Sequence, residues 1–92
     1  LPTPALAMAS MAAGQAAVMV TGSHIPADRN GLKFYLPSGE IGKADEAAIL
    51  AALGAAPGGR EAPLVRDGGA GAAYLARVVG AFGPDALRGM RI

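Results

Sequence analysis

A short polar stretch in the first half of the sequence places a serine beside a histidine, Ser23 and His24, just after the apolar run of residues 16–20. A hydroxyl that directly follows a strand, with Gly22 before it, is held at the edge of a sheet with little side-chain cover. Such a hydroxyl can carry a phosphoryl group, and the neighbouring imidazole can take or give a proton near neutral pH. These residues predict a loop that binds or carries phosphate.

The residues around this pair suit the same chemistry. Gly22 gives the backbone access to angles closed to other residues, which brings a phosphate close. Pro26 stiffens the far side of the loop, and Asn30-Gly31 is a turn signal that leads into the next apolar run. Lys33 stands one residue into that run and can place a positive charge over the loop.

The same residue types also fit an ordinary surface loop. A lone histidine in a loop is usually a solvated side chain, and a lysine within a strand usually protects an edge. The loop has no Gly-Lys-Ser/Thr and does not match a nucleotide-binding P-loop. Residue types alone therefore leave both interpretations open.

Two predicted strands position the loop. Residues 16–20 form an apolar run that is too short for an independent helix, which predicts a fully buried strand. Residues 32–36 predict a second strand, closed by Pro37-Ser38-Gly39. A brief edge strand is expected at Leu64-Val65, and residues 90–92 resemble the beginning of another strand.

Helices flank the predicted strands. Thr3 is expected to cap the first helix, with Pro4 at its first position and Gly14 at its end. A second helix is expected over residues 43–53, and apolar spacing over residues 75–82 predicts a third. The order helix, strand, loop, strand, helix predicts an α/β fold without internal repeats.

Composition excludes several classes of protein. The 92 residues contain no cysteine and one histidine, which excludes disulfide scaffolds and makes an all-protein metal cage unexpected. A net charge of +1, without a basic stripe, gives no sign of nucleic-acid binding. No apolar run is long enough to cross a bilayer, and a cytoplasmic location is expected.

The composition also predicts a weak core. Of the 92 residues, 22 are alanine and 14 are glycine, so few large side chains remain for packing. The chain begins at Leu1 rather than at methionine, and we expect an excised segment that is marginally stable by itself.

The order of the loop residues resembles a known family. Thr-Gly-Ser-His-x-Pro over residues 21–26, followed by Asn-Gly-x-Lys over residues 30–33, resembles the phosphoserine loop of the α-D-phosphohexomutases, the phosphomannomutases and phosphoglucomutases. Pro-Thr-Pro at residues 2–4 and Gly39-Glu40 also look like that family. The resemblance implies part of a three-layer α/β/α domain with a mixed sheet. Residues 1–84 would be the C-terminal half of domain I, and residues 85–92 the first strand of domain II.

The resemblance implies phosphoryl transfer between the 6- and 1-positions of a hexose phosphate. Ser23 would carry the phosphoryl group, with hexose 1,6-bisphosphate as intermediate and activator. His24 and Lys33 match family residues implicated in proton handling and charge stabilisation. The expected phosphate-binding residues are Thr21, Gly22 and, from its charge alone, Arg29.

The resemblance also implies a Mg²⁺ ion held by the phosphoseryl oxygen of Ser23, with its other ligands outside these residues. The family's Asp-x-Asp-x-Asp metal loop and its sugar-selecting loop are absent, and Asp67-Gly68-Gly69 cannot replace the metal loop. Ile25 stands where many members have asparagine, so it either narrows the substrate preference or simply packs. The chain alone is expected to be inactive.

The expected partners are a hexose phosphate and the remaining domains of the same enzyme, with no nucleic acid and no membrane. Phosphoglucosamine mutase is an alternative, although alanine commonly stands at the position of Gly22 in that group. A non-catalytic α/β interaction module is a second alternative.

Overall fold

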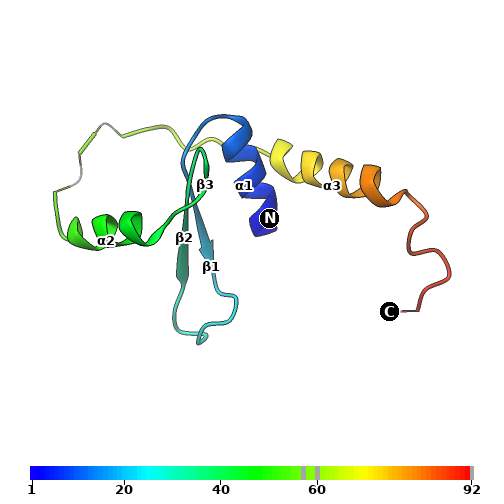
Figure 1. The fold of residues 1–92 in the computed structure, drawn as a ribbon, viewed down its shortest axis with the longest axis horizontal. Coiled ribbons are helices and arrows are strands. Elements are labelled where there is room, and N and C mark those ends of the chain that lie inside the picture. Colours follow the sequence, from blue (N-terminus) through cyan, green and yellow to red (C-terminus); the bar gives the residue numbers. More distant parts are fainter. Residues whose placement is uncertain (57, 60, 92) are drawn as a thin grey trace.

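The computed structural model describes residues 1–56, 58–59 and 61–91. Helices and strands follow one another along a chain that measures 55 × 31 × 26 Å (Figure 1). The elements are α1 (Thr3–Ala12), β1 (Ala17–Thr21), β2 (Gly31–Leu36), β3 (Gly39–Glu40), α2 (Lys43–Ala51) and α3 (Gly69–Phe82). The predicted α/β class and the helix, strand, loop, strand, helix order are confirmed.

The three strands form one antiparallel sheet in the order β1-β2-β3. The register of β1 and β2 runs from the Ala17–Tyr35 pair to the Thr21–Gly31 pair. Pro37 and Ser38 form the turn into β3, where Leu36 pairs with Gly39. The second strand was predicted to end at this turn, and β3 was not predicted as a strand.

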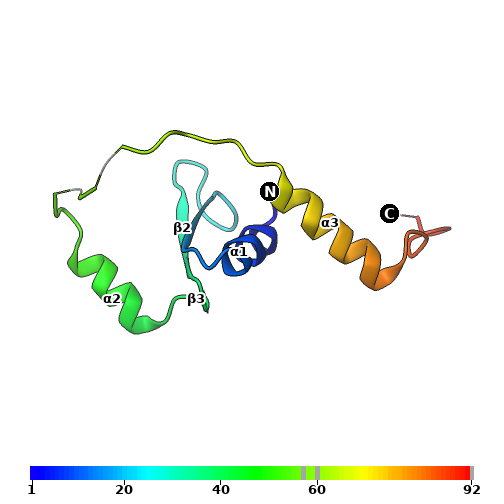
Figure 2. The ribbon, with the colours of Figure 1, turned by 90° about the horizontal axis from the view of Figure 1, so that it is seen from above.

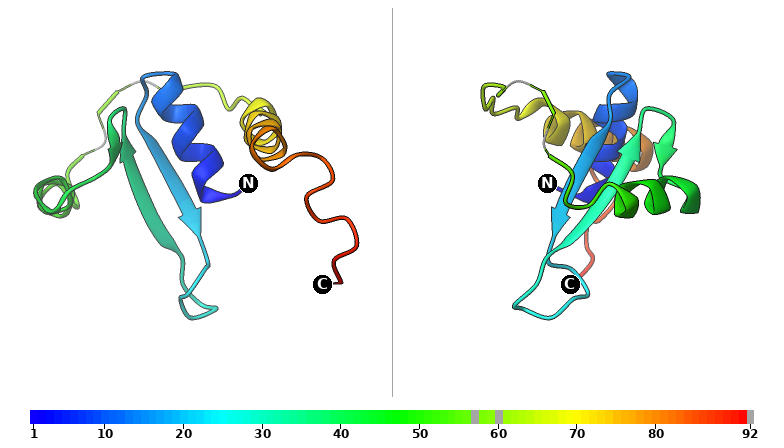
Figure 3. Two further views of the ribbon diagram at one scale, coloured as in Figure 1. Left: turned by 45° about the vertical axis from the view of Figure 1, so that its right-hand side comes forward. Right: turned by 90° about the vertical axis from the view of Figure 1, so that its left-hand side faces the viewer.

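Helix α1 covers one face of the sheet and also contacts α3 (Figure 3). Tyr35 of β2 and Ala5 of α1 are buried in this layer. On the opposite face Val18 is 50% exposed and Val20 is 62% exposed. The prediction of a fully buried β1 is therefore wrong, because the described residues cover only one face of the strand.

The start of α1 differs from the prediction and its end agrees. Pro2 is the N-cap and Thr3 is already helical, without a side-chain capping hydrogen bond. Proline at the start of a helix sets the backbone angle without a side-chain cap, which explains the difference. Gly14 adopts a left-handed φ of 64°, and the amide of the next residue, Gln15, donates to the Ser10 carbonyl, so the predicted stop is confirmed.

Helices α2 and α3 form close to where they were predicted. In α2 the Asp45 carboxylate accepts a 2.9 Å hydrogen bond from the Gly42 amide, which caps the first turn. The predicted edge strand at Leu64-Val65 is wrong, since neither residue belongs to a strand of the described structure and they are 95% and 77% exposed. Residues 85–91 contain turns and no strand, and Ile92 lies outside the described residues.

The described chain is extended, and Figure 2 shows α2 and α3 reaching out on opposite sides of the sheet. The radius of gyration is 16.9 Å, against about 12 Å for a compact domain of this length. The accessible surface is 7833 Å², against about 4,900 Å² for a compact protein of this mass. Large apolar faces therefore stay open, in agreement with the weak core expected from composition.

Candidate functional site

The candidate loop, residues 22–30, joins the end of β1 to the start of β2. It projects beyond the strands at the end of the hairpin opposite the β3 turn (Figures 1 and 3). Ser23 and His24 are both exposed. The hydroxyl that the sequence singled out is therefore reachable by a large ligand.

Thr21 orders the backbone at Ser23. The Ser23 amide donates a 3.1 Å hydrogen bond to Oγ1 of Thr21, which is the last residue of β1. A hydroxyl that accepts from the amide two residues later makes a local turn. Phosphate binding by Thr21 stays a prediction; in this structure its hydroxyl oxygen orders the backbone that carries Ser23.

His24 has a left-handed backbone, with φ of 61°. Few non-glycine residues adopt this conformation, although histidine adopts it more often than most. Gly22 was predicted to provide unusual backbone angles, yet it lies outside the left-handed region. The sharp change of chain direction falls on His24, two residues later, and this was not visible in the sequence.

Gly22 retains one property expected of it. A methyl group added there would meet no described atom within 4 Å. The space beside the Ser23 backbone is open, which is compatible with the predicted close approach of a phosphate.

A second turn closes the far side of the loop. The Arg29 amide donates a 3.0 Å hydrogen bond to the Pro26 carbonyl. Nε of Arg29 lies 4.0 Å from Oδ2 of Asp28, and both side chains are about three-quarters exposed, at 74% and 77%. An exposed pair of this kind is weak, so the guanidinium remains available to a stronger anionic partner.

Ile25 packs at the base of the loop. Of residues 22–30, all of which the structure describes, Ile25 is the only one that is not exposed. A methyl group on Gly31 would lie 3.8 Å from Cδ1 of Ile25 and 3.6 Å from Cγ2 of Thr21. Of the two roles considered for Ile25, packing is therefore the one that the geometry supports.

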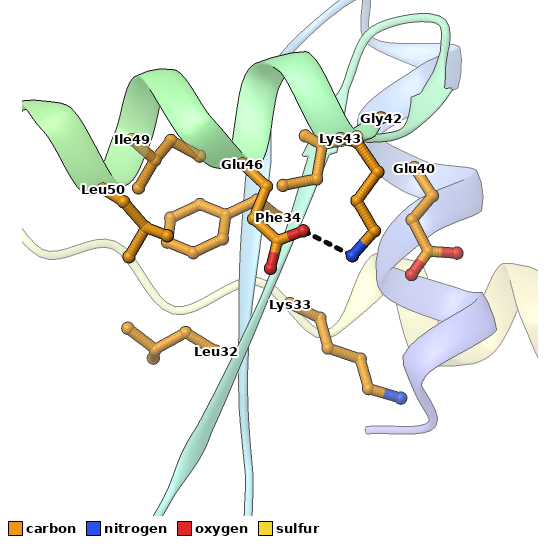
Figure 4. Close-up of a pocket in the computed structure, with 10 residues that line it drawn as sticks. Leu32, Lys33, Phe34, Glu40, Gly42, Lys43, Glu46, Ile49 and Leu50 are labelled. Carbon is orange, nitrogen blue, oxygen red and sulfur yellow. Dashed lines mark hydrogen bonds and ion pairs between the residues drawn. The ribbon is translucent and has the colours of Figure 1, made fainter.

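Lys33 lies on β2, two residue pairs from the Thr21–Gly31 pair at the loop base. That separation is about 7 Å along the strand. Lys33 pairs with Met19 and shares a sheet face with Thr21, while Figure 4 shows its side chain directed away from Leu32. Among the described residues, no hydrogen bond or ion pair joins Lys33 to Ser23 or His24.

A cavity of about 500 Å³ lies between β2 and α2 (Figure 4). Its apolar wall includes Leu32, Phe34 and Leu50, and its polar rim includes the 2.7 Å ion pair of Lys43 with Glu46. The hydrogen bond that Nζ of Lys43 donates to the Glu46 carboxylate raises the pKa of Lys43 above its ordinary value of 10.5. The β2 wall of this cavity begins at Leu32, next to the loop-base residue Gly31, and no signal in the sequence predicted the cavity.

Within the described ranges, no three histidine, aspartate or glutamate side chains gather into a group that could hold a metal ion. Ser23 offers a single oxygen, so the residues present fit at most one ligand position of a hexacoordinate ion.

None of the described helices combines the length and apolar character needed to cross a bilayer.

Comparisons with known proteins bear on the loop. Residues 1–57 match the family model for phosphoglucomutase/phosphomannomutase, alpha/beta/alpha domain I. The chain is 71% identical over 51 residues to a phosphomannomutase of Sinorhizobium fredii and 66% identical over 50 residues to a phosphomannomutase of Salmonella muenchen. These alignments cover 55% and 54% of the chain but only 11% and 10% of the two relatives. The chain thus spans about a tenth of the length of the curated relatives it matches.

Proposed function

The chain belongs to the phosphoglucomutase/phosphomannomutase family, and from this premise we propose that it contributes the phosphoryl-carrying serine loop of a phosphomannomutase. The observation that carries the proposal is the position of Ser23, which is exposed on a loop inside the matched residues 1–57. Phosphomannomutase is favoured over phosphoglucosamine mutase because both relatives bear that name.

In the proposed reaction a phosphoryl group moves from Ser23 to a free hydroxyl of a hexose phosphate. The bond between Oγ and phosphorus breaks and a bond from phosphorus to the sugar oxygen forms. The proton of the sugar hydroxyl passes to a base, for which His24 is proposed, and Oγ of Ser23 takes up a proton as it leaves. The resulting hexose 1,6-bisphosphate reorients in the site and returns its other phosphoryl group to Ser23. Phosphoryl transfer depends mainly on positioning and charge stabilisation, and an ordered, exposed serine supplies the first of these.

The surrounding residues have separate roles in this proposal. His24 adjoins Ser23 and accepts or donates the hydroxyl proton. Lys33 shares a sheet face with Thr21 and places its charge toward the transferred group. Arg29, which has only a weak exposed partner, binds a phosphate oxygen, and open space at Gly22 admits that phosphate.

We further propose that Mg²⁺ belongs to the complete site, with the phosphoseryl oxygen of Ser23 as one ligand and the others outside these residues. When bound, the ion neutralises charge on the phosphoryl group. Residues 1–84 are proposed as part of domain I and residues 85–92 as the start of domain II. The hexose phosphate and the other domains are the proposed partners, in the cytoplasm.

The test uses the full-length protein that carries these residues. Incubation with mannose or glucose 1,6-bisphosphate, followed by mass spectrometry of the loop peptide, should show a gain of about 80 Da at Ser23. Ser23→Ala is the matched control and should show no gain and no turnover of mannose 1-phosphate. A non-catalytic module would give no phosphorylated peptide, and glucosamine phosphate as the preferred substrate would favour the alternative mutase.

A further inference from the structure

We propose that Ile25 is a positioning residue that fixes the Ser23–His24 turn through an apolar latch, formed by Ile25, the Thr21 methyl group and Gly31. The inference rests on the proposed function of Ser23 and adds the residue that orders it. The geometry of the loop base carries the inference.

The latch joins the two ends of the loop. Thr21 and Gly31 face each other as the last pair of the β1–β2 ladder. Gly31 has no side chain, so Cδ1 of Ile25 and Cγ2 of Thr21 can both lie over its backbone. Ile25 thereby loses part of its exposure while its neighbours remain in solvent.

The position of Ile25 in sequence ties the latch to the reactive pair. Ser23 and His24 lie between Thr21 and Ile25, so both ends of this short segment are held at the same place. On one side the Thr21 hydroxyl accepts from the Ser23 amide at 3.1 Å. On the other side Ile25 anchors the chain directly after the left-handed His24.

This arrangement explains how an unfavourable backbone persists in an exposed loop. A left-handed non-glycine residue survives only where its surroundings determine it. The described hydrogen bonds of the segment involve Ser23 and not His24, so the anchor after His24 is the packing of Ile25. Releasing that anchor frees the turn and displaces the Ser23 hydroxyl.

The test compares variants of the full-length protein in the mutase assay. Ile25→Ala should lower kcat by about 10- to 100-fold, since a displacement of about 1 Å costs that much, with KM little changed. Ile25→Leu keeps a terminal methyl and a similar volume and should recover most of the rate. Ile25→Val removes only the contacting Cδ1 and should fall between them, and it carries the test if Ile25→Ala does not fold.

Ile41→Ala is the matched control, because Ile41 is half-buried but lies at the α2 cavity rather than at the loop. It should lower the melting temperature while leaving kcat unchanged, and hydrogen exchange at the Ser23 amide should rise in Ile25→Ala and Ile25→Val but not in Ile41→Ala. Wild-type kcat in Ile25→Ala, or equal losses in both alanine variants, would overturn the latch. Full activity in Ser23→Ala would instead refute the proposed function.

Discussion

Substitutions of His24 can separate two effects: the cost of its left-handed backbone conformation and the loss of its imidazole. At φ of 61° an alanine pays about 1–2 kcal/mol for the left-handed conformation. Glycine adopts that conformation without strain, but ordering its more flexible backbone reduces the stability of the folded loop by about 0.5–1 kcal/mol. His24→Gly should therefore hold the folded loop more firmly than His24→Ala, by about 0.5–1 kcal/mol.

Trypsin cleavage of the native full-length protein after Arg29 measures this difference. Arg29 is in the exposed loop, with a side chain 74% exposed, and cleavage in a rapidly opening segment follows the free energy of opening. A difference of 0.5–1 kcal/mol makes His24→Ala about 2- to 5-fold faster to cut than His24→Gly. His24→Asn should resemble glycine more than alanine, because asparagine tolerates the left-handed region.

Activity should rank these variants differently from loop stability. None of the three variants carries an imidazole, so all three should lose most of the turnover in the mutase assay. This holds even for His24→Gly, in which the loop is more stable than in His24→Ala. Equal cleavage rates in His24→Gly and His24→Ala would refute the backbone argument. Near-normal turnover in His24→Gly would refute the role given to the imidazole.

Four other outcomes are expected. Ser23→Ala should remove nearly all turnover of the full-length enzyme, while Lys33→Ala lowers it about 100-fold without preventing phosphorylation of Ser23; wild-type rates in either variant would contradict that assignment. Thr21→Val, which loses the acceptor for the Ser23 amide, should exchange that amide about 2- to 10-fold faster, whereas Thr21→Ser should not. Glu46→Gln should lower the pKa of Lys43 toward 10.5 in an NMR titration. Because this pKa is raised in the folded state, the Lys43–Glu46 pair adds to the free energy of unfolding in full below pH 10.5, and this stabilisation is lost as the pH rises through the raised pKa. The 92-residue chain alone should associate in analytical ultracentrifugation and show no turnover, since the other groups that hold the sugar phosphate are missing; turnover abolished by Ser23→Ala would disprove this.

The sequence predicted elements with strong local signals. The end of α1 was predicted at Gly14 because glycine favours the left-handed conformation that commonly ends a helix, and Gly14 adopts it. Helix α3 was predicted from the apolar spacing between Leu75 and Phe82. The Ser23 loop was located because a polar stretch separates two apolar runs. In each case neighbouring residues alone determine the outcome.

Features that depend on contacts across the chain were not predicted. Unusual backbone angles were expected at Gly22 from its residue type, yet the left-handed residue is His24, where Thr21 and Ile25 hold the flanking chain. Val18 and Val20 were expected to be buried because they are apolar, but burial depends on a second covering layer. An isoleucine within a polar loop was the available signal for Ile25.

The antiparallel order β1-β2-β3 leaves β1 with one neighbour among the described residues. Its other edge presents unpaired backbone amides and carbonyls along Ala-Val-Met-Val-Thr, a sequence rich in β-branched residues and without charge. Such an edge readily accepts another extended chain. An edge left unpaired during synthesis is a site where misassembly can begin, and here it lies two residues before the serine proposed to carry the phosphoryl group.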